Sequence, residues 1–242
     1  MKNLIIALTT FSIPFTFNLL KWVNYNNYEI SNSEFVTKYE NEKVTIKSND
    51  DFKVFIFDKN NDFSVVDGKP KGCEFYMNSN FFDKKNNTIG LVVINGKRQS
   101  NRISRGGFFY VLDGKPKVSR DCPSYTDYSS QAFLWGISNG QINNQLINMK
   151  HAKEETYRNV VGQNKKGDII IVTSTFGSMV TIEEILNVGK EFGMVNAVLF
   201  DGGTSLDYKF NNGEYRTKFK SLPNWIGSIS GYGNPTTYIC VN

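Results

Sequence analysis

Asp-Gly and Asn-Gly pairs recur along this chain and separate short runs of branched and aromatic residues. Both residues of such a pair accept positive φ angles, as two-residue hairpin loops require. The turn pairs are Asp67-Gly68, Asn95-Gly96, Asp113-Gly114, Asn139-Gly140 and Asn212-Gly213. The expected strands include Val44–Ile46, Val54–Phe57, Phe75–Met77, Leu91–Ile94, Phe108–Leu112 and Ile169–Thr173. The spacing therefore predicts many short strands, several of them paired as antiparallel hairpins.

One clear helix is expected after Val180. Thr181 and Glu184 form a Thr-x-x-Glu capping box, and Gly193 suits the other end of the helix. The almost wholly apolar run Val195–Phe200 follows, which predicts a strand covered on both faces in the centre of a sheet. No internal repeat or linker divides the chain. The expected fold is therefore a single α+β domain, with a mixed, largely antiparallel sheet and a few packed helices.

Composition excludes several classes of function. The chain carries 28 Lys and Arg against 23 Asp and Glu, a net charge of +5. No dense basic block concentrates this charge, so a nucleic-acid partner is not expected. A single histidine, His151, excludes a His-rich zinc site and leaves one residue for any Ser-His-Asp mechanism. We expect no metal site and no cofactor, although Ca²⁺ bound by Asp201, Asp207 and asparagines stays open.

The three cysteines, Cys73, Cys122 and Cys240, have neither zinc-finger spacing nor a Cys-x-x-Cys pair. At most one disulfide can therefore form within the chain. Cys73 and Cys240 suit a structural disulfide if the protein is exported. Two buried free thiols are the alternative.

The first residues raise a question of targeting. Leu4–Leu20 contains no charge and lies between Lys2 and Lys21, as in a secretory signal. No small-x-small cleavage site follows, so an uncleaved signal-anchor is an equal alternative, with membrane association through residues 4–20. A buried N-terminal helix of a cytosolic protein is the third reading. We expect a secreted protein, or one anchored in the membrane and facing outside.

Three short motifs are candidate sites. Asp201-Gly202-Gly203-Thr204-Ser205 follows the apolar strand, where paired glycines expose backbone amides near a ligand. Asn78 and Asn80 end another strand beside Phe81 and Phe82, a combination suited to a sugar. Arg158 stands inside an otherwise β-like run and could bind phosphate or carboxylate oxygens. Each motif taken alone also fits a structural role: a turn, a capped strand end or a solvated arginine.

Taken together and in this order, these segments resemble the phosphodiester glycosidase family. The resemblance covers roughly residues 72–241. The matching blocks are Asn78-Ser-Asn-Phe-Phe82, Gly90-Leu-Val-Val-Ile-Asn-Gly96, Arg158-Asn-Val-Val-Gly162, Lys166-Gly167 with Asp168–Val172, Asn196-Ala-Val-Leu-Phe-Asp-Gly-Gly-Thr-Ser205 and Thr237-Tyr-Ile-Cys-Val241. We therefore divide the chain into a signal peptide or anchor (1–22), N-terminal strands (23–71) and a phosphodiester-glycosidase-like catalytic core (72–242).

The resemblance implies hydrolysis of a sugar-1-phosphodiester bond in a glycan or cell-envelope polymer. Asp201 would supply the catalytic carboxylate and Arg158 would contact the phosphate. The residues expected to bind substrate are Asn78, Asn80, Gly202, Gly203, Thr204 and Ser205.

The chain departs from the family pattern at three places. Thr204 stands where the family has a third glycine, and Asn159 replaces a threonine after the arginine. The stretch Tyr232-Gly-Asn-Pro235 lacks an arginine that the family often has before its last strand. Two other functions stay open: a non-catalytic glycan- or envelope-binding domain, and a hydrolase of another phosphodiester on the same scaffold.

Overall fold

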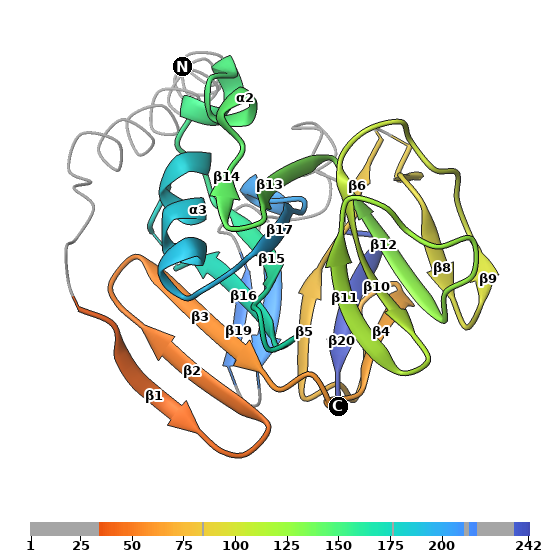
Figure 1. Cartoon of the computed structure of the whole chain (residues 1–242), viewed down its shortest axis with the longest axis horizontal. Coiled ribbons are helices and arrows are strands. Elements are labelled where there is room, and N and C mark those ends of the chain that lie inside the picture. Colours follow the sequence, from red (N-terminus) through yellow and green to blue (C-terminus); the bar gives the residue numbers. More distant parts are fainter. Residues whose placement is uncertain (1–33, 84, 176, 211–212, 217–234) are drawn as a thin grey trace, which may run out of the picture. The chain divides into compact units, whose positions relative to one another are not determined.

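The computed structural model describes residues 34–83, 85–175, 177–210, 213–216 and 235–242 (Figure 1). For Thr204 and residues 213–216 only the backbone is described. The expected signal or anchor segment, residues 1–22, lies outside the described residues, as do Asn212 and residues 232–234. Within the described part of the chain, no helix has the length and apolar character needed to span a membrane.

The largest sheet has eight strands, and every neighbouring pair in it is antiparallel. In spatial order they are β1 (Val36–Glu40), β2 (Val44–Ser48), β3 (Phe52–Phe57), β16 (Ile169–Ser174), β15 (Asn159–Gln163), β17 (Asn196–Leu199), β13 (Leu134–Ser138) and β14 (Gln141–Ile142). The apolar strand β17 lies between β15 and β13, with Leu199 opposite both Val160 and Leu134. The predicted central strand is thereby confirmed.

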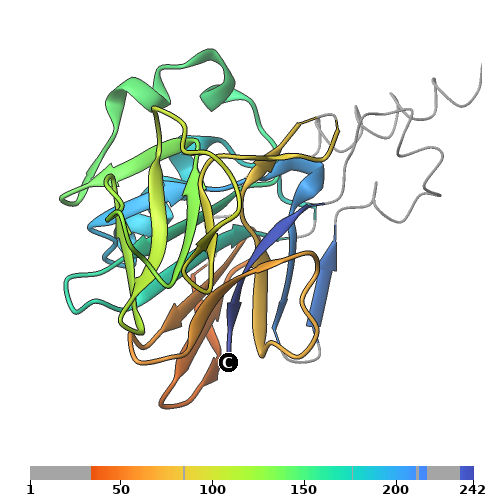
Figure 2. The same ribbon diagram turned by 90° about the vertical axis from the view of Figure 1, so that its right-hand side faces the viewer.

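Two five-stranded sheets, also antiparallel, make up most of the rest (Figure 2). One runs β11 (Lys115–Ser119), β10 (Gly107–Leu112), β12 (Tyr128–Ala132), β8 (Val92–Ile94) and β9 (Lys97–Arg98). The other runs β19 (Gly213–Arg216), β18 (Asp207–Phe210), β5 (Phe75–Asn78), β20 (Thr237–Val241) and β4 (Phe63–Asp67). A short pair, β6 (Phe81–Phe82) and β7 (Thr88–Ile89), follows β5.

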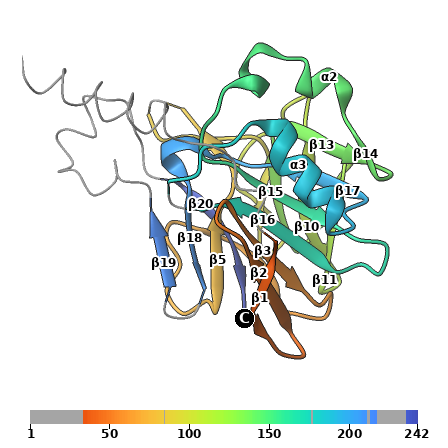
Figure 3. The same cartoon turned by 90° about the vertical axis from the view of Figure 1, so that its left-hand side faces the viewer.

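The two faces of β17 enter different cores. Val198 and Phe200 belong to a cluster that the large sheet forms with both five-stranded sheets. Ala197 and Leu199 belong to a second cluster, which includes buried residues of the helix α3 (Ile182–Glu191). Figure 3 shows α3 lying across this face of the sheet. Successive residues of a strand point to opposite faces, so one apolar strand joins two cores.

The helix α3 has the predicted capping box. The Thr181 side chain accepts from the Glu184 amide, and the Glu184 carboxylate accepts from the Thr181 amide at 2.7 Å. Gly193 follows with φ of +85°, the conformation typical of a helix end. The other helical segments are short: α2 (Asn144–Ile147), the 3₁₀ turn η1 (Lys150–Lys153) and the 3₁₀ turn η2 (Gly203–Ser205).

The expected α+β class is wrong. Strands hold 46% of the described residues and helical segments 11%, so the fold is mainly β. The expectation of a mixed sheet is also wrong, because all the strand pairs named above are antiparallel. The expectation of a mixed sheet rests on the helix α3 leading directly into the apolar strand β17, an order typical of helix–strand units in mixed sheets. Here β15 separates β17 from β16 and gives it an antiparallel neighbour.

The predicted turn pairs fall into two groups. Asn95-Gly96, Asp113-Gly114 and Asn139-Gly140 form two-residue hairpin loops with positive φ at both positions. Asp67-Gly68 does not form one, because β4 pairs with β20 and not with the next strand. For the fifth pair, Gly213 starts β19, and Asn212 lies outside the described residues.

A disulfide joins Cys73, just before β5, to Cys240 on β20 across a sequence separation of 167. Of the two alternatives left open by the sequence, the structure has the bonded pair. Cys122 is a free, partly buried cysteine. The disulfide therefore ties neighbouring strands of one sheet that are far apart in the sequence.

Candidate functional site

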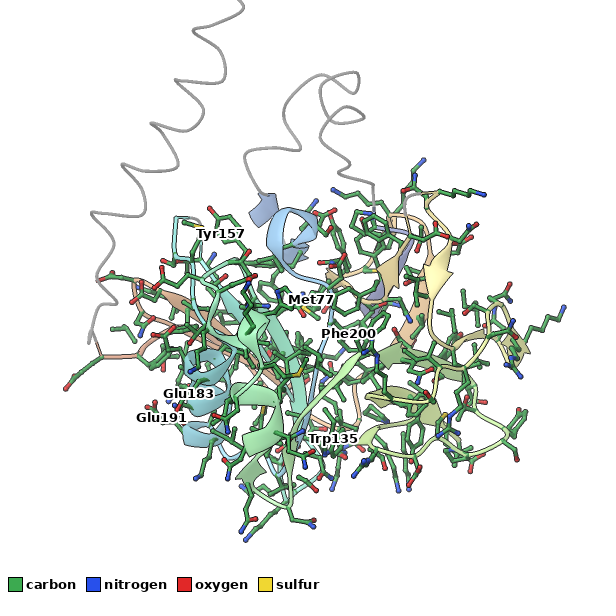
Figure 4. The ribbon with its side chains drawn as sticks, turned by 90° about the horizontal axis from the view of Figure 1, so that it is seen from above. Met77, Trp135, Tyr157, Glu183, Glu191 and Phe200 are labelled. Carbon is green, nitrogen blue, oxygen red and sulfur yellow. A yellow bond between two sulfur atoms is a disulfide. The ribbon has the colours of Figure 1, made fainter. Side chains whose placement is uncertain are left out.

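Three chain segments meet at the end of β17, and each carries one of the predicted motifs. The segments are Asn78–Asn80 after β5, Tyr157–Asn159 at the start of β15, and Asp201–Gly203 after β17. The amide of Asp201 donates to the carbonyl oxygen of Ser79 at 3.0 Å. Figure 4 labels Met77, Tyr157 and Phe200, which lie in or beside these segments. The chain therefore passes from the large sheet to the β5 sheet at Asp201.

Two buried amides hold the backbone carbonyl oxygen of Asp201. Asn78 donates to it through Nδ2 at 2.8 Å, and Asn159 does so through its own Nδ2 at 2.9 Å. The Oδ1 atom of Asn78 accepts from the Asp207 amide at 2.9 Å. Asn78 is 0% exposed and Asn159 is 1% exposed. These side chains therefore fix the position of Asp201 from the protein interior.

Asn80 also faces the interior and is 0% exposed. Its Nδ2 donates to the Gln131 carbonyl at 2.9 Å, and its Oδ1 accepts from the hydroxyl groups of Ser130 and Thr237. We expected Asn78 and Asn80 to orient a sugar, and in the structure both side chains are buried inside the protein. Both amides are bonded to the protein, and their place in the site is to position its backbone.

The glycines after Asp201 allow a close approach of two backbones. A Cβ atom on Gly202 would lie 2.4 Å from the carbonyl oxygen of Tyr157 and 3.4 Å from the Cα of Arg158. The amide of Gly203 donates to that same Tyr157 oxygen at 2.6 Å. The Gly203 amide was expected to bind substrate, and in the structure it is bonded to Tyr157 instead. Only a glycine fits at position 202 without displacing the chain.

Arg158 lies beside this loop and is half-buried. Its Nη2 donates to the carbonyl oxygens of His151 at 3.1 Å and Glu154 at 2.8 Å. Its Nε is buried and has no hydrogen-bond partner among the described residues. Burial lowers the pKa of Arg158, while the charge of Glu154 opposes this effect. An arginine stays charged after such a shift, so the site keeps a fixed cation.

The remaining predicted residues are close in sequence but differ in their surroundings. The side chains of Asp201 and Ser205 are half-buried, and Ser205 lies in the 3₁₀ turn η2. Thr204 is in the same turn, and its side chain lies outside what the structure describes. Asp207, considered for Ca²⁺, is 1% exposed and accepts from the Tyr238 hydroxyl at 3.0 Å. The described residues contain no cluster of three His, Cys, Asp or Glu side chains that could hold a metal ion.

The structure adds two groups that the sequence did not identify: the Asn159 amide and the Tyr157 carbonyl. Asn159 was noted only as a departure from the family pattern. An asparagine buried at the start of an apolar strand is itself a signal, because such a group needs hydrogen-bond partners. The role of the Tyr157 carbonyl follows from a contact between segments distant in sequence, which no local pattern reveals.

Comparisons with known proteins identify a matching family model and solved structures of similar fold. A model of the phosphodiester glycosidase family matches residues 71–227. The catalytic domain of zebrafish N-acetylglucosamine-1-phosphodiester alpha-N-acetylglucosaminidase, auto-inhibited by its pro-peptide, has a similar fold. Its TM-score is 0.64 at 16% identity, covering 88% of this chain and 85% of that one. A hypothetical protein from Synechocystis gives a TM-score of 0.62 at 13% identity, covering 86% of this chain and 64% of that one.

A search of curated proteins gives no match. The structural likenesses, at these identities, establish the fold. The family model covers more than half of the sequence, from just before Gly72 to beyond the Asp201 loop. The chain therefore belongs to the phosphodiester glycosidase family.

Proposed function

We propose that this protein is a hydrolase that cleaves a sugar-1-phosphodiester bond in a glycan or cell-envelope polymer. One observation carries the proposal. The backbone of Arg158 lies against Gly202, with 3.4 Å between the Arg158 Cα and the position of a Cβ on that glycine. The residues proposed to supply the carboxylate and the cation are thereby held on touching segments. Family membership supports the same reaction.

The reaction is favoured by a negatively charged protein group near the sugar and a positively charged one near the phosphate. When the bond between the anomeric carbon and the phosphate oxygen breaks, positive charge develops on the sugar and negative charge on the departing phosphate. The Asp201 carboxylate would stabilise the first charge, as nucleophile, base or electrostatic partner. The Arg158 guanidinium would stabilise the second. Such groups act most strongly when they are fixed before the reaction and shielded from water.

Hydrogen bonds within the site hold Asp201 and Arg158 in position. Asn78 and Asn159 donate hydrogen bonds to the backbone carbonyl oxygen of Asp201, so the backbone that carries the Asp201 carboxylate is fixed in position. His151 and Glu154 hold one nitrogen of Arg158 through their carbonyl oxygens. The Nε–H of Arg158 remains as a buried donor without a partner among the described residues. Buried donors are rarely left unpaired in proteins, and a phosphate oxygen would satisfy this one.

The test is an assay of the purified full chain on methyl phosphodiesters of several sugar 1-phosphates, measuring the reducing sugar released. The wild type should release sugar, and Asp201→Asn should lower turnover by a factor of about 100 or more while its melting temperature stays unchanged. Near-normal turnover in this variant would remove Asp201 from the mechanism. Binding without release from any sugar would instead indicate a glycan-binding domain, and release from nucleotide or teichoic-acid-like diesters alone would indicate a different hydrolase.

We also propose that the protein functions outside the cytosol, secreted or anchored facing outside. The support is the disulfide between Cys73 and Cys240, since such bonds persist in oxidising compartments. Thiol labelling of the protein isolated from its own cells tests this idea. The two cysteines should be labelled only after reduction. Labelling without reduction would place the protein in a reducing compartment.

A further inference from the structure

A separate cavity of about 620 Å³ lies between β13 and the loop that precedes β10. Its lining includes three arginines, Arg102, Arg105 and Arg120, and a single acidic residue, Asp121. Aromatic and amide side chains complete the wall, among them Phe133, Trp135, Gln141 and Gln145. This combination of cations, rings and amides is suited to an anionic sugar derivative.

Two of the three arginines, Arg102 and Arg105, lie against aromatic rings. The Cζ of Arg102 lies 4.8 Å from the centre of the Phe108 ring, and the Cζ of Arg105 lies 4.7 Å from that of Phe133. Stacking on a ring restricts a guanidinium while leaving its N–H groups able to bind oxygen atoms in pairs. Asp121 lies 3.6 Å from Arg102, but its side chain is 91% exposed, so it neutralises the arginine only weakly.

The loop that carries Arg102 and Arg105 is itself fixed from the interior. Gln131 is 1% exposed, and its side chain makes four hydrogen bonds to backbone groups. Its Oε1 accepts from the amides of Leu91 and Ile103, and its Nε2 donates to the carbonyl oxygens of Ile103 and Arg105. The cavity wall is therefore preorganised, which lowers the entropy lost when a ligand binds.

Trp135 supplies an unused donor. It lines the cavity, and its indole Nε1 is buried without a hydrogen-bond partner among the described residues. Figure 4 labels Trp135 on β13. The edge of the six-membered ring faces Gly107, so the nitrogen lies on the opposite edge of the indole. A buried N–H of this kind normally finds an acceptor, and an oxygen of a bound anion would provide one.

The cavity lies close to the Asp201 site. Leu134 lines it and pairs with Leu199, two residues before Asp201. Two residues of strand span roughly 7 Å. The cavity and the Asp201 loop therefore both adjoin the end of the β13–β17 pair where Leu134 lies opposite Leu199.

We propose that this cavity is a second anion-binding site, which takes a phosphate-bearing segment of a glycan polymer. The choice of a polymer rests on the proposed function, whereas the anion site rests on the cavity alone. Each guanidinium would bind phosphate oxygens, the Trp135 N–H would bind a further oxygen, and Gln141 and Gln145 would bind sugar hydroxyl groups. The protein would then favour a chain of sugar phosphates over a single sugar 1-phosphodiester.

The experiment measures equilibrium binding by calorimetry in the full chain carrying Asp201→Asn, so that turnover does not interfere. The probes are a poly(glycosyl phosphate) oligomer, inorganic phosphate and a neutral dextran oligomer of similar length. The oligomer should bind at least about tenfold more tightly than either of the others. The triple variant R102Q/R105Q/R120Q should lower its affinity at least about tenfold, and Trp135→Phe should lower it by a smaller factor.

A matched control separates the site from net charge. The variant K97Q/K115Q/K117Q removes the same charge from exposed lysines that do not line the cavity, and it should change affinity less than about twofold. Equal losses in the two triple variants would overturn the proposal, as would inorganic phosphate binding as tightly as the oligomer. Because binding is measured without hydrolysis, a failure here is distinct from a failure of the proposed reaction.

Discussion

The side-chain amide of Asn159 donates a 2.9 Å hydrogen bond to the backbone carbonyl oxygen of Asp201. The other end of the same side chain, Oδ1, is buried without a partner among the described residues. A buried acceptor left unpaired costs about 1–3 kcal/mol. The unpaired Oδ1 of Asn159 therefore lowers the stability of the fold at the residue that positions Asp201. Unpaired buried polar groups of this kind are often found at functional sites.

Replacing Asn159 by aspartate tests this relationship. The change keeps the shape of the side chain but puts an acceptor against the Asp201 carbonyl, so Asn159→Asp should destabilise the fold by about 1–3 kcal/mol. Turnover of the sugar-1-phosphodiester should fall at least about tenfold. The melting temperature and the reducing-sugar assay check the two effects. Asn144→Asp, the same change at an exposed residue of α2, should alter neither, and an unaltered Asn159→Asp protein would contradict the positioning role.

Adding one methyl group at Gly202 should displace the Asp201 loop. A Cβ there would lie 2.4 Å from the Tyr157 carbonyl oxygen, so Gly202→Ala should cost about 1–3 kcal/mol and greatly reduce turnover. Gly68→Ala is the comparison, because Gly68 has a positive φ but open space around it. Thermal unfolding should show a loss of about 1 kcal/mol for that control. If both variants lose equal stability and Gly202→Ala keeps its turnover, the close contact has no bearing on the site.

Arg158 is expected to act on the phosphate and not on the sugar. Arg158→Gln removes the charge but keeps an amide that can donate to the carbonyl of His151 or Glu154. Turnover of a sugar-1-phosphodiester should therefore fall at least about tenfold, while turnover of an aryl glycoside of the same sugar falls much less. Steady-state rates on the two substrates give the comparison. Arg98→Gln, at an exposed arginine bonded to Ser100 and Asn101, should leave both rates unchanged. Equal losses on both substrates in Arg158→Gln would refute the phosphate role.

Reducing the disulfide should lower the stability of the protein but leave its β-sheet fold intact. Cross-linking residues separated by 167 positions restricts the unfolded chain, and such bonds contribute about 2–5 kcal/mol. We expect Cys73→Ser with Cys240→Ser to lower the midpoint of urea unfolding, and a reducing agent to do the same to the wild type. Cys122→Ser, at the free cysteine, should change the midpoint much less. A wild-type midpoint that does not respond to reductant would show that the bond contributes little.

Local patterns in the sequence predicted local structure well. Three Asn-Gly or Asp-Gly hairpins, the capping box of α3 and the doubly covered strand β17 are confirmed, because each depends on residues near one another in the chain. The predicted fold class was wrong because it depends on contacts between residues far apart in the chain. Whether β17 has parallel or antiparallel neighbours depends on β15 and β13, and no property of β17 itself reveals which strands flank it.

In the candidate site, too, the sequence predicted local motifs but not the contacts between distant segments. The order of the motifs identified the family, and the three segments they mark do meet. What the motifs could not give is the direction of each side chain. Asn78 and Asn80 read as sugar ligands in sequence, yet their amides are satisfied inside the protein. The arginine cavity was not predicted at all, because Arg102, Arg105 and Arg120 are brought together only by the turns of the β10 sheet.

The position of β20 has a consequence for how the protein is made. This strand inserts between β4 and β5, which have no pairing with each other, and its cysteine bonds to Cys73. Until residues 237–241 leave the ribosome, β4 and β5 each present an open edge to the surroundings. Completion of this sheet must therefore follow synthesis of every strand from β1 to β19, and ribosome-stalled chains that stop before β20 are expected to be prone to aggregation.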